Sequence, residues 1–472
     1  MAVKKEPAKK SVGKINKNQI KVKTAPKKEV RKEISADDEQ AKKTAANLNL
    51  VRGMRDIIPP QGEIWRRIVR NAESIASAYG FQYIETPIVE ALSLFVRSVG
   101  RGTDVVDKEM YAFEDRDGGK LCLRPEATAS VARAYVMHGL QTLPQPVKVW
   151  YEGPMFRYDR PQAGRYREFH QFGCETLGDK SPVVDAELIC VAYNLLNDLG
   201  LKTIVHINSI GTAEDREQYV VELSGYLRTK RAYLCEECKK RMSKNTLRVL
   251  DCKNEQCRSV IVEAPQIIDW LSEESKNFFM KVLEYLDELA IPYVLTSTLV
   301  RGLDYYTHTV FEFYPEDAEE KSQNALGGGG RYDALVELLG GQSTPAAGFS
   351  IGLERVLSAM TERTDKKEMA VAGKPKVAIF FAQLGEQARR RSLFLIEELR
   401  RDGIVVQHNL AKSSLKAQME IANRDNATHT LILGQKEVQD GTIILRNMES
   451  GIQEIIDQKK IRQNARRLLE TQ

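Results

Sequence analysis

The chain has 472 residues, 42% of them hydrophobic, and a formal net charge of +5. At roughly 150 residues per domain, this length predicts about three domains with sizeable cores. No apolar run approaches the roughly 20 residues of a membrane span, and the first residues lack the apolar segment of a secretory signal. The composition therefore argues against a membrane or secreted protein and favours the cytoplasm.

The N-terminal segment is the most basic part of the chain. Residues 1–45 contain 14 Lys and Arg against 6 Asp and Glu, a net +8, so the remaining residues sum to 5 − 8 = −3. The segment 1–46 cannot bury enough apolar surface to fold alone, and we predict a disordered extension. Two interpretations stay open: a Lys-rich arm that binds nucleic acid, and a solubilising or targeting extension. A mitochondrial presequence would be Arg-rich and poor in acidic residues, which this segment is not.

Helix and strand patterns begin near residue 47 and continue to residue 363. Apolar residues at helical spacing predict a helix over 63–79, which Gly80 ends, and a second helix over 182–199. Strands are predicted over 81–84, 120–123, 147–151, 169–176 and 310–314. Strands mixed with helices without strict alternation predict an α+β domain over 47–363, built on an antiparallel sheet.

A charged, helical segment over 212–289 interrupts this pattern and is predicted to be an inserted module. Its cysteines read Cys235-Glu-Glu-Cys238 and, 13 residues later, Cys252-Lys-Asn-Glu-Gln-Cys257. The arrangement is similar to a zinc ribbon, in which four thiolates surround one ion, although four residues separate the second pair instead of two. Two alternatives stay open: a structural zinc site, and reduced cysteines without metal.

The last part of the chain has a different pattern. Residues 364–375, composed largely of Lys, Glu, Ala, Gly and Pro, are predicted to be a linker. Strands are then predicted over 377–381, 404–407, 428–433 and 442–448, with helices over 386–400 and 416–424. This alternation predicts a separate α/β domain over 376–472.

Residues suited to chemistry are concentrated in three segments of the domain 47–363. The first, Arg301-Gly302-Leu303-Asp304-Tyr305-Tyr306, directly precedes a predicted strand. Its arginine can clamp a carboxylate or a phosphate, and its two tyrosines can wall a small planar ligand and hydrogen-bond it. The simpler alternative is a solvated arginine followed by two core tyrosines.

The second and third segments each combine arginines with a strand or a helix. The second runs from Glu152 to Gln171 and places Arg157 and Asp159 before a basic loop, which suits a triphosphate. The third, Gly348-Phe349-Ser350-Ile351-Gly352-Leu353-Glu354-Arg355, leads from small residues into a helix that bears one arginine.

These segments resemble motifs 2 and 3 of class II aminoacyl-tRNA synthetases, with Pro87 and its preceding helix similar to motif 1. The first segment narrows the resemblance to the histidyl-tRNA synthetase family, whose characteristic histidine stretch is similar to Arg301–Tyr306. Further matching segments are Leu123–Thr128, Pro161–Gly173 and Gly328–Asp333. The resemblance covers about residues 48–472. It implies an antiparallel sheet flanked by helices, a C-terminal anticodon-binding domain, and a homodimer formed through motif 1.

The resemblance also implies roles in the use of ATP with Mg²⁺. Arg157 is expected to contact the α-phosphate, and Arg355 the distal phosphates. Arg301 is expected to bridge the α-phosphate and the histidine carboxylate, where it stabilises negative charge as the carboxylate attacks. Asp159 stands where the general class has a glutamate near the adenine, one methylene longer.

A second set of residues is expected to bind L-histidine. The resemblance implies that Glu126, Thr128 and Gln171, with Ala127 beside them, hold the amino and carboxylate groups. It implies that Glu175 and Tyr306 pair with the imidazole nitrogens, next to Tyr305. From the residues alone, Glu126 could instead complement a helix dipole, whereas the equal parity of Gln171 and Glu175 predicts a common strand face. The run Gly327–Gly330 could be only a loop and is not a Walker P-loop.

The implied activity is that of a histidine–tRNA ligase, which forms histidyl-adenylate and transfers histidine to tRNA(His). A site that hydrogen-bonds both ring nitrogens rejects analogues that lack them, and no separate editing domain is then needed. Two other classes are weighed. The regulatory subunit of ATP phosphoribosyltransferase lacks the anticodon-binding domain and has degraded motifs. A class II enzyme for proline, threonine or glycine does not carry the segment Arg301–Tyr306.

Overall fold

The computed structural model describes residues 49–100, 103–159, 164–316, 325–363 and 379–470. The predicted extension 1–46 and the predicted linker 364–375 lie outside these residues. Within the described ranges, no helix is both long and apolar enough to cross a bilayer.

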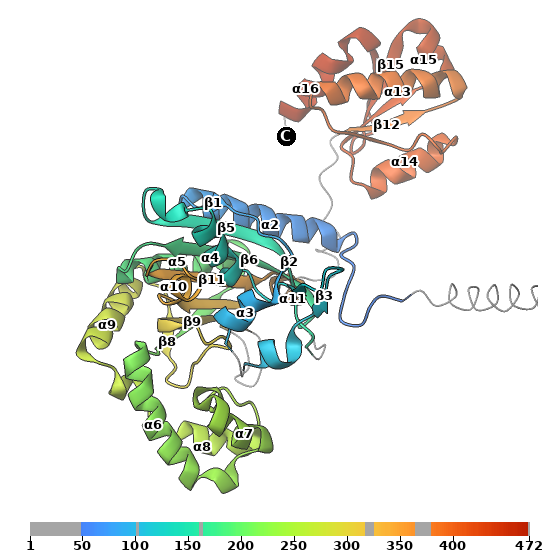
Figure 1. Ribbon diagram of the computed structural model, residues 1–472. Coiled ribbons are helices and arrows are strands. Elements are labelled where there is room, and N and C mark those ends of the chain that lie inside the picture. Colours follow the sequence, from blue (N-terminus) through green and yellow to red (C-terminus); the bar gives the residue numbers. More distant parts are fainter. Residues whose placement is uncertain (1–48, 101–102, 160–163, 317–324, 364–378, 471–472) are drawn as a thin grey trace, which may run out of the picture. The chain divides into compact units, whose positions relative to one another are not determined.

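An eight-stranded sheet is the centre of the N-terminal domain (Figure 1). In spatial order its strands are β1 (Gln82–Tyr83), β5 (Val147–Phe156), β6 (Glu168–Leu177), β11 (Ala346–Gly352), β10 (Gly327–Arg331), β9 (Thr307–Pro315), β7 (Thr203–Ser209) and β8 (Tyr293–Leu295). Neighbouring strands are antiparallel, except that β1 is parallel to β5 and β8 to β7. The predicted α+β fold on an antiparallel sheet is therefore confirmed. A small second sheet contains β2 (Val89–Ala91), β4 (Lys120–Leu123) and β3 (Ala112–Glu114).

Helices pack on both faces of the large sheet. They are α2 (Gln61–Ala78), α4 (Thr128–Met137), α5 (Pro182–Asp198), α9 (Glu273–Glu288), α10 (Leu335–Leu338) and α11 (Leu353–Arg363). Helix α3 (Leu92–Ser98) packs instead against the small sheet and α4. One apolar core lies between the sheet and α2, α5, α9 and α11. The other face of the sheet packs against α4 and against residues of the segment 212–271.

Strand β6 shows how alternation separates this core from the chemistry. Phe172 and Cys174 lie in the core beneath α2 and α5. Because successive side chains of a strand point to opposite faces, Gln171 and Glu175 point to the other face. The same alternation places Phe349 of β11 in the core and Gly348 on the face of Glu175.

Helix α2 follows directly from its sequence pattern. Trp65, Ile68, Ala72 and Ala76 recur every three or four residues and are buried as one stripe. The helix ends before Gly80, whose φ of +78° is a left-handed conformation that glycine adopts without strain.

Strand β10 contradicts the interpretation of Gly327–Gly330 as a loop. Glycine is disfavoured in strands, yet this run is hydrogen-bonded to β9 on one side and β11 on the other. The following Arg331 is fully buried, and its Nε donates to Asp185 of α5 at 3.0 Å. The neighbouring strands and this ion pair hold the glycine run in an extended conformation.

The predicted module contains α6 (Ala213–Thr229), α7 (Glu236–Lys244) and α8 (Glu255–Val262) (Figure 1). Helix α9 also falls within the predicted range 212–289, but its apolar side chains pack into the core beneath the sheet. Asp215 joins the two ends of the module. Its carboxylate accepts from the backbone N–H of Thr212 at 3.0 Å and of Ser272 at 2.9 Å.

Short helical turns complete the N-terminal domain: η1 (Val105–Glu109), η2 (Leu140–Thr142), η3 (Arg231–Tyr233), η4 (Thr246–Val249) and η5 (Ile267–Trp270).

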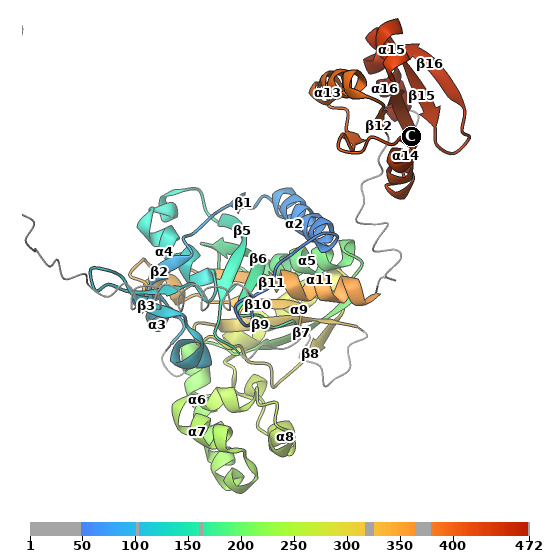
Figure 2. The same cartoon turned by 90° about the vertical axis from the view of Figure 1, so that its right-hand side faces the viewer.

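The C-terminal domain is an α/β unit with its own core. Its sheet contains, in spatial order, β13 (Val406–His408), β12 (Ile379–Gln383), β14 (His429–Leu433), β15 (Thr442–Asn447) and β16 (Gln453–Asp457). Its helical elements are α13 (Glu386–Arg401), α14 (Leu415–Arg424), α15 (Gln435–Asp440), η6 (Gln458–Lys460) and α16 (Ile461–Glu470). Helices α13 and α16 pack on one face of the sheet and α14 on the other (Figure 2).

Candidate active site and cysteine cluster

Glu175 lies at the centre of a fully buried hydroxyl cluster. Thr128 donates from Oγ1 to Glu175 Oε1 at 2.7 Å, and the Tyr151 hydroxyl donates to the same oxygen at 3.3 Å. The hydroxyl of Tyr332 donates to the second oxygen. Burial disfavours the charged carboxylate and outweighs these donors, so the pKa of Glu175 is raised to about 8.

The segment before β9 brings two tyrosine rings to the same region. The rings of Tyr305 and Tyr306 are buried, with centroids 4.7 Å apart, and Tyr305 also lies edge-on to Tyr332 at 5.7 Å. Burial is the main cause of the raised pKa of Tyr306, and the nearby charge of Glu175 raises it further. Tyr306, which is expected to bind the imidazole, therefore lies close enough to Glu175 for the two groups to interact electrostatically.

Glu126 occupies the N-terminus of α4. Its carboxylate accepts from the backbone N–H of Thr128 at 2.7 Å and of Ala129 at 3.0 Å. Ala127, the residue between Glu126 and Thr128, is buried. The hydroxyl of Tyr305 donates to Glu126 at 3.4 Å. Burial raises the pKa of Glu126, against the effect of the two N–H donors. The helix-terminus role weighed from the sequence is thus present, in a carboxylate that also contacts the tyrosine pair.

Gln171 carries an unused acceptor on the same face. Its Nε2 donates to Ser350 Oγ at 3.2 Å, whereas its Oε1 is buried without a hydrogen-bond partner among the described residues. A buried polar atom left unpaired costs about 1–3 kcal/mol. An amino group bound beside Gln171 would satisfy this oxygen.

Arg301 forms an ion pair with Glu312 of β9, through its Nη1. The hydroxyl of Tyr314 donates to the other oxygen of Glu312 at 2.6 Å, and the Arg301 guanidinium lies 5.7 Å from the Tyr306 ring centre. Burial lowers the pKa of Arg301, but Glu312, Tyr306 and Tyr305 together outweigh this effect and raise the pKa overall. Its Nε has no partner among the described residues, which leaves a donor for a ligand.

Three glycines leave the room that these side chains occupy. An added Cβ at Gly348 would lie 1.5 Å from Glu175 Oε2. At Gly328 it would lie 2.7 Å from Nη1 of Arg301, and at Gly330 it would lie 2.9 Å from the ring of Tyr306. The side chains of Arg301, Tyr306 and Glu175 therefore lie directly against the backbone of β10 and β11.

A cluster of arginines lies at the other end of the site. Arg157 donates from Nε to the carbonyl of Pro125 at 2.8 Å, which directs its guanidinium. Arg355 donates to the carbonyls of Gly164 and Ala325. Burial, followed by the charges of Arg165 and Arg157, lowers the pKa of Arg355. Cations gathered in a partly buried site favour a polyanionic ligand.

Asp159 forms an ion pair with an arginine of this basic loop. Its Oδ2 accepts from Nη1 of Arg165 at 3.2 Å, and Arg167 stacks over the Tyr158 ring at 3.6 Å.

A carboxylate couples α11 to strand β6. Glu354 accepts the backbone N–H of His170 at 2.9 Å and faces its Nδ1 at 3.0 Å. Burial lowers the pKa of His170, but the bond to Glu354 and the charges of Glu354, Glu152 and Glu168 together outweigh burial and raise the pKa overall. This pair fixes the start of α11 and, with it, the adjacent Arg355.

Some residues of the site escaped the sequence analysis. Tyr151, Tyr332 and Glu312 were not assigned, although they contact Glu175 or Arg301. Tyr151 is paired with Gly173 across β5 and β6, and an added Cβ at Gly173 would lie 2.4 Å from its hydroxyl. This relationship depends on strand register, and no local pattern indicates it.

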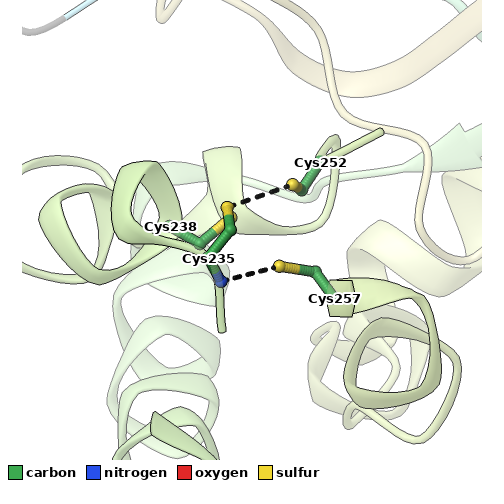
Figure 3. A group of neighbouring side chains, drawn as sticks. All are labelled: Cys235, Cys238, Cys252 and Cys257. Atoms are coloured by element: carbon green, nitrogen blue, oxygen red, sulfur yellow. Dashed lines mark hydrogen bonds between the residues drawn. The ribbon is translucent and has the colours of Figure 1, made fainter. Parts of the chain in front are cut away.

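The four cysteines of the module converge (Figure 3). The sulfurs of Cys235, Cys238, Cys252 and Cys257 all lie within 4.8 Å of one another. Cys235 Sγ and Cys252 Sγ are 3.8 Å apart. A tetrahedral zinc with Zn–S bonds of about 2.3 Å would place its sulfurs about 3.8 Å apart. Backbone N–H groups of Cys235 and Asn254 point to sulfurs of Cys257 and Cys252, at 3.2 and 3.4 Å. The donor set and its spacing fit a zinc ion.

Comparisons with known proteins agree with this geometry. Residues 53–356 match the family model of histidyl-tRNA synthetase, and residues 377–467 match that of an anticodon binding domain. Similar proteins include the histidine–tRNA ligase of Dehalococcoides mccartyi strain 195, 44% identical over 86% of this chain and 96% of that protein. Another is the histidine–tRNA ligase of Desulfosudis oleivorans, 45% identical over 87% of this chain and 95% of that protein.

Solved structures show the same relationship. The apo histidyl-tRNA synthetase of S. aureus has a TM-score of 0.73 at 34% identity, over 89% of this chain and 99% of that one. A Bacillus halodurans protein described as an ATP phosphoribosyltransferase regulatory subunit/histidyl-tRNA synthetase shares the fold. It has a TM-score of 0.56 at 20% identity, over 82% of this chain and 98% of that one. The family model spans most of the N-terminal domain, and the matched relatives align over nearly their whole length. The chain belongs to the histidyl-tRNA synthetase family.

Proposed function

We propose that the pocket between Glu175 and the arginine cluster joins L-histidine to ATP, as the first step of a histidine–tRNA ligase. The carboxylate of histidine attacks the α-phosphorus, a P–O bond forms to give histidyl-adenylate, and the bond to pyrophosphate breaks. The histidine is then transferred to tRNA(His), with release of AMP. The observation that supports this proposal is that arginines lie beside the buried tyrosine–carboxylate cluster: Arg301 is 5.7 Å from the Tyr306 ring centre, and Arg157 donates to the carbonyl of Pro125, next to Glu126.

In this proposal Arg301 and Arg157 act on the reacting groups. Arg301 lies beside Tyr306, so it can contact both the carboxylate of histidine and the α-phosphate. Arg157, directed by its bond to the Pro125 carbonyl, contacts the α-phosphate from the other side. Both charges are fixed before reaction, and a fixed charge stabilises the developing negative charge without reorganisation cost.

The histidine side chain is bound at the end of the site opposite the arginines. Glu175 and Tyr306 pair with the imidazole nitrogens, and Tyr305 lies against the ring. Glu126, Thr128 and Gln171 hold the amino group, with Ala127 in the same segment. The unpaired Oε1 of Gln171 supports this assignment because an ammonium group is a strong donor.

ATP occupies the arginine end. Arg355 contacts its distal phosphates, and Asp159 lies near the adenine. Mg²⁺, when bound with ATP, neutralises phosphate charge. Glu312, next to the arginines, offers carboxylate oxygens of the type that Mg²⁺ prefers. The domain 376–472 binds the anticodon of the tRNA.

We also propose that two copies of the chain form a dimer through the region that resembles motif 1. Large apolar side chains are exposed there on or beside β1, β2 and β3: Tyr83, Ile88, Val89 and Phe113. Exposed apolar side chains that gather on one surface mark interaction sites. Light scattering of the purified chain measures its mass, and a monomer at working concentration would contradict this proposal.

The cysteine cluster holds a structural zinc in this proposal. Four thiolates at tetrahedral spacing would add metal-binding energy to the folding of a small module. The chain works in the cytoplasm, where thiols stay reduced, and its seven cysteines are free of disulfides.

The basic extension 1–46 adds a sequence-independent attraction for tRNA.

The test is histidine-dependent exchange of pyrophosphate into ATP, measured with purified chain and without tRNA. Exchange is expected with L-histidine and Mg²⁺-ATP, and not with other amino acids as controls. Absence of exchange with histidine would overturn the enzymatic proposal and favour a non-catalytic relative. Aminoacylation of tRNA(His) in a second assay tests the transfer step separately.

A further inference from the structure

The segment Arg301–Tyr306 has contacts on two sides. It connects β8 to β9, and its backbone N–H at Asp304 donates to the carbonyl of Val99 at 3.2 Å. On its other side it contacts the inserted module. Because this segment carries both Arg301 and Tyr306, whatever holds its backbone also sets the geometry of the proposed histidine site.

Two side chains of the module donate directly to this segment. Arg216, in the first turn of α6, donates from Nη1 to the backbone carbonyl of Tyr306 at 2.6 Å. Asn245, which follows α7, donates from Nδ2 to Asp304 Oδ1 at 2.8 Å. The two bonds act on Asp304 and Tyr306, on either side of Tyr305.

The segment packs closely on one side but less closely on the side of the module. Tyr305 and Tyr306 are buried in the core. Towards α6, a cavity of about 390 Å³ is lined by Arg216 and Asn245 of the module and by Val300, Arg301 and Asp304. Where side chains do not close against each other, dispersion contacts are lost. On this side, directional hydrogen bonds from the module supplement the packing.

Besides this bond, the charge on Arg216 interacts with that of Asp304 without forming a salt bridge. Among the described residues, no carboxylate lies within salt-bridge distance of its guanidinium, whereas the neighbouring Arg241 and Arg248 both lie close to Asp104. Those ion pairs connect the module to the turn after α3, so the module is anchored independently of Arg216. The anchored module therefore offers Arg216 a fixed base from which to hold the Tyr306 carbonyl.

We propose that Arg216 and Asn245 are positioning residues for histidine activation, so that the module orients Arg301 and Tyr306 even when no tRNA is bound. The inference rests on the proposed function. It adds that the module acts in the first half-reaction. Neither residue touches histidine or ATP; each acts through the backbone or side chain of the segment 301–306.

The experiment compares Arg216→Ala with Arg228→Ala in histidine-dependent pyrophosphate exchange without tRNA. Arg228 is an exposed arginine on the same helix, so its variant controls for loss of charge and of helix propensity. Arg216→Ala is expected to raise the KM for histidine about tenfold and to lower kcat, with the KM for ATP within about twofold of wild type. Arg216→Lys retains a donor and is expected to restore part of the loss.

A second pair of variants tests the other bond. Asn245→Asp places a second carboxylate beside Asp304 and is expected to raise the histidine KM more than Asn245→Ala does. Near-UV circular dichroism of each variant shows whether the native packing is intact.

The outcomes separate the two proposals. If wild type exchanges and Arg216→Ala behaves like Arg228→Ala, the positioning role is overturned while the proposed function stands. Equal rises in the KM for histidine and ATP would also overturn it, because they indicate general damage to the site. If wild type shows no exchange, the proposed function itself fails.

Discussion

Glu175 Oε2 lies 1.5 Å from the point where position 348 would carry a Cβ. The carboxylate and the missing side chain therefore occupy the same space on two adjacent strands, which pair Glu175 with Gly348. We predict that Gly348→Ala displaces Glu175 and removes most histidine-dependent exchange. The matched control is Gly225→Ala, at a helix position with open space around the added Cβ. Exchange near the wild-type rate in Gly348→Ala would contradict a role for Glu175.

The raised pKa of Glu175 makes stability depend on pH. Between its ordinary value of 4.5 and about 8, the folded state keeps a proton that the unfolded chain has lost. This group therefore contributes stability that falls as pH rises through that window. Glu175→Gln removes the titration, so the difference in Tm, variant minus wild type, is expected to increase from about pH 5 to about pH 8. A pH-independent difference in thermal unfolding experiments would refute the assignment.

Arg301 is expected to be sensitive even to a conservative change. Lysine keeps the positive charge but loses the planar fork that can contact two oxygens at once. Arg301→Lys should lower the rate of exchange on the order of a hundredfold, comparable to loss of one charge-stabilising donor. Lysine can still pair with Glu312, so the fold should persist, as near-UV circular dichroism can verify. A variant within about twofold of wild type would exclude the proposed role at the α-phosphate.

The cysteine cluster predicts about one zinc per chain in purified protein, measured by atomic emission. Cys238→Ser should lose the metal and lower the Tm by several degrees, because metal-binding energy is folding energy. Cys190→Ser, outside the cluster, is the control and should retain the metal. Metal-free wild-type protein with unchanged Tm would favour the alternative of reduced cysteines.

The basic extension predicts a salt effect. Deletion of residues 1–46 should reduce the slope of log affinity for tRNA against log salt, because fewer counterions are then released. Exchange without tRNA should be unchanged by the deletion. An unaltered slope would leave the extension as a solubilising or targeting segment.

Much of the fold was predictable because local patterns and tertiary structure agree. β4 was predicted over 120–123 and spans Lys120–Leu123; the helix predicted over 182–199 spans Pro182–Asp198. β10 was not predictable from local preference, since glycine disfavours strands and only hydrogen bonding from β9 and β11 makes this one. Strand β7, between two predicted elements, was also missed.

The residues of the site also fall into a predictable and an unpredictable group. Residues within recognisable segments, such as Arg301 and Arg157, could be named from the sequence. Tyr151, Tyr332 and Glu312 could not, because their relevance depends on strand register and on the glycines opposite them. The contact of Arg216 with the Tyr306 carbonyl crosses 90 residues of sequence, and no local pattern indicates it.

The hydrogen bonds of Asp215 bear on how the module can change during evolution. The residues it bonds, Thr212 and Ser272, are the points where the module leaves the sheet and where it returns. Because both residues bond to the same carboxylate, the module begins and ends at one place in the fold. It therefore does not alter the register of any strand. Such a segment can lengthen, shorten or exchange its cysteines over evolutionary time while the sheet stays constant, and a short turn between these two points would suffice to close the domain without it.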